Sequence, residues 1–224
     1  MKERMTTTRA RLRHWPMWLA MLCMISSAQA SAQEDGWSTG TTDKGSITVK
    51  YRVSTRTNDK GDDVPLIEYI ATATADVSMP ALNALMKDAS RHHEFMGDKT
   101  SQRVAVLSDN EWVVHSHYHA PWPFPDNDRV SRMTIAEDSA PKTAVFTFSA
   151  APSLYKETGV KRVTYYRQVY TFNDLGGGKV ELRLDTTMSP PNNAPLWMIR
   201  AAFPGMGAAP LRKLIQLAGK IEAP

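Results

Sequence analysis

The sequence predicts an α+β fold in which an antiparallel sheet carries helices on one face. Two observations lead to this prediction. Apolar and polar residues alternate from residue 47 onward, and the period of two returns in successive segments between residues 101 and 188, which is typical of an antiparallel meander. The period changes to that of a helix near residues 79–95 and again near the C-terminus.

Residues 1–30 have the order of a secretory signal peptide. Basic residues precede an apolar run over 15–25, and Ala28 and Ala30 then supply the small residues that a signal peptidase requires. A membrane anchor is the alternative, but the run is too short for the ~20 residues needed to span a bilayer. We therefore expect cleavage after Ala30, with Ala32 as the nearby alternative, and a periplasmic or secreted mature protein.

The charge balance excludes one class of partner. The chain has 27 Lys and Arg residues against 23 Asp and Glu residues, but the basic excess lies in residues 1–30 and the rest is formally neutral. A nucleic-acid surface needs clustered basic residues, so no nucleic-acid partner is expected. The single cysteine, Cys23, also lies in the leader. The mature chain therefore forms no disulfide and depends on its hydrophobic core.

The first half of the mature chain predicts a lead-in, two strands and a helix. Residues 31–45 are polar and lack a hydrophobic period, so a flexible lead-in is expected there, followed by one domain over 46–222. Alternation predicts paired strands over 47–53 and 66–75. Ser78 suits a helix N-cap and Pro80 a first turn, and the apolar residues after them recur at helical spacing. A helix over 79–95 is the result.

The second half predicts six strands and a closing helix. The strands are expected over 101–108, 111–119, 129–137, 143–151, 163–174 and 179–188. The fifth exceeds the usual limit of about ten residues, so we expect a bent sheet with a concave face. An apolar segment over 194–218 suits a helix on that face, and Pro204-Gly205 must kink or divide it.

Three segments in this order resemble the StAR-related lipid transfer (START) domains. The strand over 111–119 runs into Pro121-Trp122-Pro123-Phe124-Pro125 and then Arg129-Val130, residues 159–168 match the family's phosphatidylcholine-transfer branch, and residues 195–202 match its lid helix. The sequence departs from the family at Asn127, where arginine is usual, and at Arg129, where an aromatic is usual. The resemblance implies a helix-grip fold: a curved antiparallel sheet wrapped around a long C-terminal helix, enclosing a hydrophobic cavity.

The resemblance also implies a function. We expect binding and transfer of one lipid or other hydrophobic small molecule by a monomer, with transient membrane contact and without a catalytic residue, cofactor or metal. Arg129, Tyr166 and Gln168 would orient a polar group of the ligand, and Tyr166 matches a headgroup contact of the phosphatidylcholine branch. Together with the alternation, the resemblance predicts these ligand-binding residues: Trp112, Val114, Ser116, Arg129, Met133, Phe146, Phe148, Tyr166, Gln168, Tyr170, Leu182, Met198, Phe203 and Leu211.

A row of histidines raises metal binding as an alternative function. His115, His117 and His119 fall on one face of a strand, about 6.6 Å apart stepwise, a spacing from which a metal site could be built. The opposite face is the more apolar one, so the histidines are expected to point to solvent. No carboxylate or cysteine is placed by the sequence to complete a ligand set, and no metal is predicted.

Two other functions remain open. The first is an enzyme of the cyclase or hydrolase type that acts on a buried apolar substrate on the same scaffold, and it requires a titratable residue in the interior. The nucleophile elbow, phosphate loop and metalloprotease helix motifs are missing from the sequence after residue 30. The second is an interaction module whose core is filled by its own side chains.

Overall fold

The computed structural model describes residues 36–120, 122–138, 142–191 and 194–222. The predicted signal peptide and its cleavage site at Ala30 lie outside the described residues. Among the described residues, no helix is long and apolar enough to cross a membrane.

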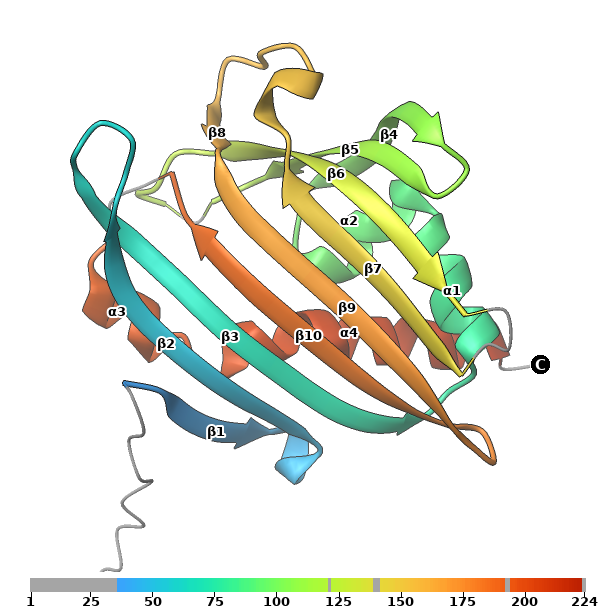
Figure 1. Ribbon diagram of the computed structural model, residues 1–224. Coiled ribbons are helices and arrows are strands. Elements are labelled where there is room, and N and C mark those ends of the chain that lie inside the picture. Colours follow the sequence, from blue (N-terminus) through green and yellow to red (C-terminus); the bar gives the residue numbers. More distant parts are fainter. Residues whose placement is uncertain (1–35, 121, 139–141, 192–193, 223–224) are drawn as a thin grey trace, which may run out of the picture. The chain divides into compact units, whose positions relative to one another are not determined.

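The strands form one sheet in the order β1-β2-β3-β10-β9-β7-β6-β5-β4 (Figure 1). Neighbours on this path are antiparallel, and the short β8 pairs with β6 in parallel. β3 and β10 pair at the middle of the sheet although they lie far apart in the sequence. The strands are β1 (Ser38–Thr42), β2 (Ile47–Thr57), β3 (Asp63–Asp76), β4 (Thr100–Ser108), β5 (Glu111–Tyr118), β6 (Asn127–Glu137), β7 (Thr143–Ala150), β8 (Lys161–Val163), β9 (Tyr165–Gly176) and β10 (Lys179–Ser189).

The expected strands are present, and the structure differs from the prediction at the N-terminal side. Residues 38–42 of the expected lead-in form β1, which pairs with β2 and is followed by a 3-10 turn, η1 (Asp43–Gly45). β1 has no apolar side chain, so its stability comes from backbone pairing and it leaves no hydrophobic period to detect. The fifth predicted strand begins as β8 and continues as β9.

The first predicted helix is interrupted. α1 (Met79–Lys87) begins at Ser78, whose hydroxyl accepts a hydrogen bond from the Ala81 backbone amide at 3.3 Å. The Asp88 carboxylate then accepts a hydrogen bond from the Ser90 backbone amide at 3.1 Å. This local bond competes with helical pairing and starts a 3-10 turn, η2 (Ala89–Arg91). α2 (His92–Met96) follows and ends at Gly97, with φ of 81°.

The C-terminal segment is divided as Pro204-Gly205 predicts. α3 (Leu196–Ala201) and α4 (Gly205–Glu222) are joined by a short link over 202–204. Figure 1 shows the helices on one face of the sheet, and α4 packs against β2, β3, α1 and α2. The inner face of the sheet is therefore the one that α4 covers.

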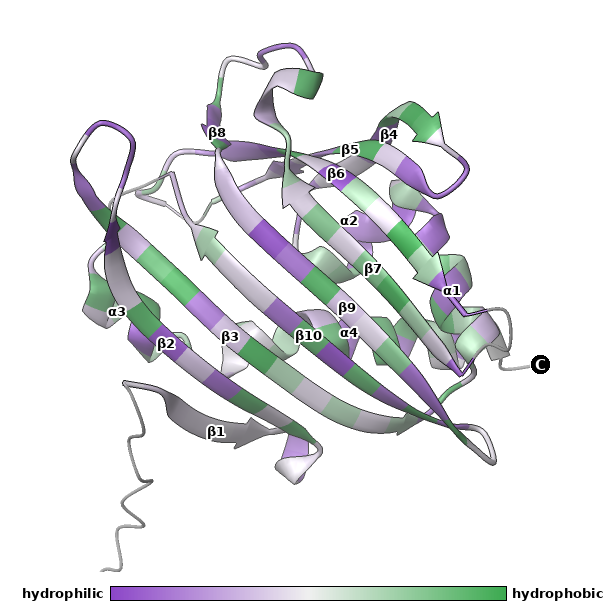
Figure 2. Cartoon of the chain, viewed as in Figure 1, coloured by the Kyte–Doolittle hydropathy of each residue, from purple (hydrophilic) through white to green (hydrophobic). Residues whose placement is uncertain are grey.

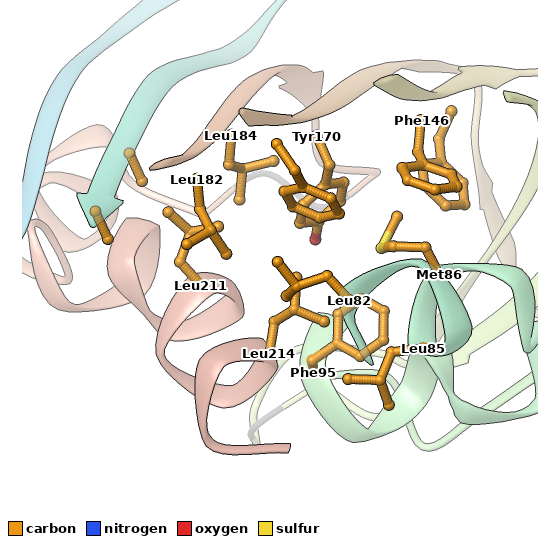
Figure 3. Close-up of a cluster of buried hydrophobic side chains, with 14 of the residues drawn as sticks. Leu82, Leu85, Met86, Phe95, Phe146, Tyr170, Leu182, Leu184, Leu211 and Leu214 are labelled. Carbon is orange, nitrogen blue, oxygen red and sulfur yellow. The ribbon is translucent and has the colours of Figure 1, made fainter. Parts of the chain in front are cut away.

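The core lies between this inner face and the helices. Hydropathy alternates along β3, β9 and β10 in Figure 2, as expected for strands with one buried face. In Figure 3, Phe146, Tyr170, Leu182 and Leu184 from the sheet face a set of helical side chains. That set is Leu82, Leu85 and Met86 from α1, Phe95 from α2, and Leu211 and Leu214 from α4.

Candidate ligand-binding site

A row of polar side chains crosses the inner face of the sheet. The Tyr166 hydroxyl donates a hydrogen bond to Gln168 Oε1, and Gln168 Nε2 donates to Thr186 Oγ1 at 3.2 Å. Thr186 is in register with Tyr69 of β3, whose hydroxyl lies beside it. The Arg129 guanidinium lies 5.2 Å from the centroid of the Tyr166 ring. We call Tyr69, Thr186, Gln168, Tyr166 and Arg129 the polar row.

Arg129 forms a buried ion pair with Asp98. Its Nη2 donates to Asp98 Oδ1, and the side chains are 14% and 0% exposed. Burial alone opposes the positive charge, but the Asp98 carboxylate raises the pKa of Arg129 above its usual value. Burial raises the pKa of the Asp98 carboxyl, and the adjacent Arg129 guanidinium opposes that shift. The charged pair has no net charge.

Of the four buried side-chain atoms without a conventional hydrogen bond among the described residues, two belong to this site. They are the Tyr170 hydroxyl and Asp98 Oδ2, although the Ser116 side chain lies near the Asp98 carboxylate. Figure 3 shows the Tyr170 hydroxyl pointing from the sheet toward the helices, near Leu82 and Leu214. An unsatisfied buried group costs about 1–3 kcal/mol. A polar group of a ligand could satisfy these atoms.

Tyr166 and Tyr170 both keep a hydroxyl proton at neutral pH and can donate a hydrogen bond. Burial raises the pKa of Tyr166, and burial likewise raises the pKa of Tyr170. Their hydroxyls therefore stay protonated. Because most of the remaining inner face is apolar, these donors and the ion pair define where the polar part of a ligand would lie.

Most of the predicted ligand-binding residues come together in this interior. Trp112, Val114, Ser116, Met133, Phe146, Phe148, Tyr166, Gln168, Tyr170, Leu182, Phe203 and Leu211 are buried, and Arg129 joins them through the polar row. Met198 differs: it is 38% exposed, because α3 turns Ile199 toward the core instead. Their role in binding stays a prediction.

The interior is closely packed around several of these residues. Met133, Phe146, Tyr170, Leu182 and Leu211 each have an exposed fraction of 0%. A void large enough for a water molecule would give its lining atoms accessible surface, so no such void adjoins these five side chains. A ligand must therefore displace side chains or move a helix to occupy this part of the expected cavity.

Sequence reasoning missed three members of the site. Tyr69 and Thr186 lie on strands with alternating apolar and polar residues, at positions that face inward. The alternation was therefore the signal that could have identified them. Asp98 follows the Gly97 turn, outside any periodic segment. No local pattern could have predicted that its carboxylate would meet Arg129.

The histidine row differs from its prediction at His115, which is 8% exposed rather than solvent-facing. The segment over 152–163 covers this part of the outer face, and the His115 ring lies 4.8 Å from that of Tyr155. Its Nε2 is 3.2 Å from Asp128, while His117 and His119 both contact Asp126. Among the described residues, no group of three or more such side chains is arranged to hold a metal ion.

A pocket of about 500 Å³ opens beside the interior, at the edge of the sheet. We call it the edge pocket. It lies where β1 begins beside β2. Ser38 pairs with Tyr51, and within the described part of the chain no strand pairs with residues 52–57 on that side. Its lining consists of Gly36, Ser38, Tyr51, Arg52, Val53, Ser54 and, from α3, Arg200.

Solved structures share this arrangement of sheet and helices. A STAR-related lipid transfer protein fragment from Xanthomonas axonopodis matches with a TM-score of 0.66 and 20% identity, over 84% of this chain and 100% of that one. Human STARD10 matches with a TM-score of 0.66 and 13% identity, over 84% of this chain and 75% of that one. The chain adopts the helix-grip fold of START domains.

The same fold is found in an enzyme. Zhui aromatase/cyclase from a Streptomyces species matches this START-like chain with a TM-score of 0.52 and 12% identity, over 70% of this chain and 96% of that one. No protein-family model and no curated protein matches the sequence. The fold alone therefore does not distinguish ligand binding from catalysis, and the residues of the interior must decide between them.

Proposed function

We propose that this protein binds one hydrophobic molecule between the sheet and α4 and transfers it without chemical change. The observation that carries the proposal is the polar row within a largely apolar interior, next to the unpartnered Tyr170 hydroxyl. Such sparse polar groups orient a ligand, while apolar burial at ~25 cal/mol per Å² drives binding. The START neighbours named above support this choice.

The interior favours an uncharged ligand with one hydrogen-bonding group. Arg129 is already paired with Asp98, so a phosphate or carboxylate would compete with the Asp98 carboxylate for the guanidinium of the polar row. Burial of an additional unpaired charge is costly. A hydroxyl or carbonyl group can instead accept from Tyr170 and leave the ion pair intact.

Transfer requires contact with a membrane, and one end of the sheet suits it. β10 ends there beside the first residues of β3 and β9, and α3 follows. Trp122 and Trp197 belong to segments at this end and are 92% and 67% exposed. Tryptophan favours the membrane–water interface. We expect vesicle binding to fall when both are replaced by alanine, and an export signal in residues 1–30 would place this activity in the periplasm.

The proposal is tested by extraction and mass spectrometry of the protein purified from its native compartment. A stoichiometric neutral lipid is expected, and its amount should fall in the Tyr166→Phe, Gln168→Leu variant. An Arg183→Gln variant, on the exposed part of β10, provides a control that should keep the ligand. A protein free of ligand in every preparation, with a melting temperature indifferent to added lipids, would favour the filled-core module instead.

One observation supports the enzyme as a second candidate. An enzyme on this scaffold needs an interior titratable group, and Asp98, Arg129 and Tyr166 meet that requirement. They can orient and polarise a carbonyl group of a bound substrate. Conversion of the extracted molecule during incubation with the pure protein, lost in Tyr166→Phe, would decide for catalysis.

A further inference from the structure

The edge pocket lies on the same line as the polar row. The sheet register aligns Ser38, Tyr51, Tyr69, Thr186 and Gln168 across five neighbouring strand segments. Ser38 and Tyr51 line the pocket, while Tyr69, Thr186 and Gln168 belong to the row. The pocket and the polar row therefore lie on one line that crosses the strands of the sheet.

Two aromatic rings separate the pocket from the row. The Phe203 ring lies parallel to that of Tyr51, with centroids 4.6 Å apart and an angle of 9° between the planes. Phe203 also contacts Tyr69, with centroids 5.6 Å apart. Phe203 belongs to the link between α3 and α4 rather than to either helix. A change of this link could therefore displace its ring without unfolding a helix.

Contacts on both sides of Phe203 fix the segments between which such an opening would form. Arg200 Nη2 donates to the Val53 carbonyl at 2.8 Å and ties α3 to the uncovered edge of β2. On the other side of Phe203, a Cβ atom at Gly40 would lie 2.9 Å from Pro204 Cγ, so β1 touches the link directly. While residue 204 is proline, a side chain at residue 40 would push the link away.

We propose that the edge pocket is the entrance through which a neutral hydrophobic ligand reaches the interior, and that Phe203, stacked on Tyr51, is its gate. This inference rests on the proposed function, because it assigns a route to the same interior. The ligand passes between the edge of β2 and α3 when the Phe203 ring leaves Tyr51. α4 can then stay on α1 and α2 during exchange.

The test measures how fast a neutral apolar probe, N-phenyl-1-naphthylamine, leaves the full-length protein after dilution. Phe203→Ala should release the probe about tenfold faster, since most interface changes act on dissociation. Tyr155→Ala removes a ring from the outer face of the sheet, where it lies 4.8 Å from that of His115, and should leave the rate near that of the wild type. Equal acceleration by both variants would mean general loosening and would overturn the gate.

A reversible tether provides an experiment that does not depend on the stability of Phe203→Ala. A Cβ atom at Gly40 would lie 3.2 Å from Pro204 Cβ, near the ~3.8 Å of a disulfide. In a Cys23→Ser background, the oxidised Gly40→Cys, Pro204→Cys variant should release the probe about tenfold more slowly than its reduced form. Equal release rates in the oxidised and reduced forms, with binding retained, would contradict the proposed entrance alone. No probe binding in any form would contradict both the entrance and the proposed function.

Discussion

Arg212 of α4 forms a bidentate ion pair with Asp43, in which its Nε and Nη2 atoms lie 2.6 and 2.8 Å from the two carboxylate oxygens. The contact joins residues 169 positions apart, from the N-terminal turn η1 to the C-terminal helix. Both side chains are 31% exposed, so its free energy is modest. Its effect is geometric, because it holds α4 against the end of β1.

The backbone beside this ion pair predicts a stabilising substitution. Lys44 has φ of 59°, in the left-handed region that costs a residue with a Cβ about 1 kcal/mol. Lys44→Gly should therefore raise the free energy of unfolding by about 0.5–1 kcal/mol, measured by urea denaturation. Lys44→Ala is the matched control and should change it little. A glycine variant less stable than the alanine variant would contradict this reading of the turn.

His92 predicts a loss of stability in acid. Its side chain is buried, its Nε2 lies 2.8 Å from the Met86 carbonyl, and burial lowers the pKa of His92 from 6.5 to about 4. Below pH 6.5 the unfolded chain therefore binds a proton that the folded chain does not. The contribution of His92 to the free energy of unfolding should be fully present above pH 6.5. It should fall by about 3 kcal/mol on acidification toward pH 4.

The comparison that isolates His92 uses two glutamine variants. His92→Gln should flatten the dependence of the unfolding free energy on pH between 6.5 and 4, whatever its effect on absolute stability. His119→Gln, at a side chain that is 70% exposed, should keep the slope of the wild type. An unchanged slope in His92→Gln would show that another group takes up the proton.

The buried ion pair predicts non-additive effects. Arg129→Met leaves the Asp98 carboxylate buried without its partner and should cost about 3–5 kcal/mol of stability. The double variant Arg129→Met, Asp98→Leu removes both charges and should be more stable than Arg129→Met alone. Chemical denaturation of the two single variants and the double variant forms the cycle. Additive losses would indicate that the two residues do not interact.

The Tyr170 hydroxyl predicts opposite effects on stability and binding. Without a ligand it is buried and unpartnered, so Tyr170→Phe should stabilise the ligand-free protein by about 1 kcal/mol. The same change should weaken binding of a hydroxyl-bearing lipid, measured by calorimetry, because the donor is lost. Tyr165→Phe, on the exposed side of β9, is the control. If binding is unchanged in Tyr170→Phe, this hydroxyl does not contact the ligand.

The fold could be predicted from the sequence where side-chain periods carry the information. Alternation located the strands from β2 onward, and Pro204-Gly205 marked the division between α3 and α4. β1 could not be found in this way because Ser38–Thr42 pairs through its backbone alone. The break after α1 depends on the Asp88 carboxylate, which accepts hydrogen bonds from the backbone amide and the hydroxyl of Ser90. A regular apolar pattern conceals this cause.

The site was predictable only in part, for a similar reason. Tyr166 and Gln168 followed from alternation together with the START resemblance, and their mutual hydrogen bond confirms that they share the inner face. The ion pair and the edge pocket join residues from loops, strands and α3 that are distant in the sequence. Such contacts depend on the tertiary arrangement and leave no pattern within one segment.

The pairing of β3 with β10 has a consequence for how the chain folds. These strands lie at the middle of the sheet, yet β10 is synthesised more than a hundred residues after β3. Contacts of such long range slow folding, because a large loop must close before they form. The apolar inner face of β2 and β3 therefore stays uncovered until α4 has also left the ribosome. A chain that stops near residue 190 would keep that face exposed and is expected to aggregate.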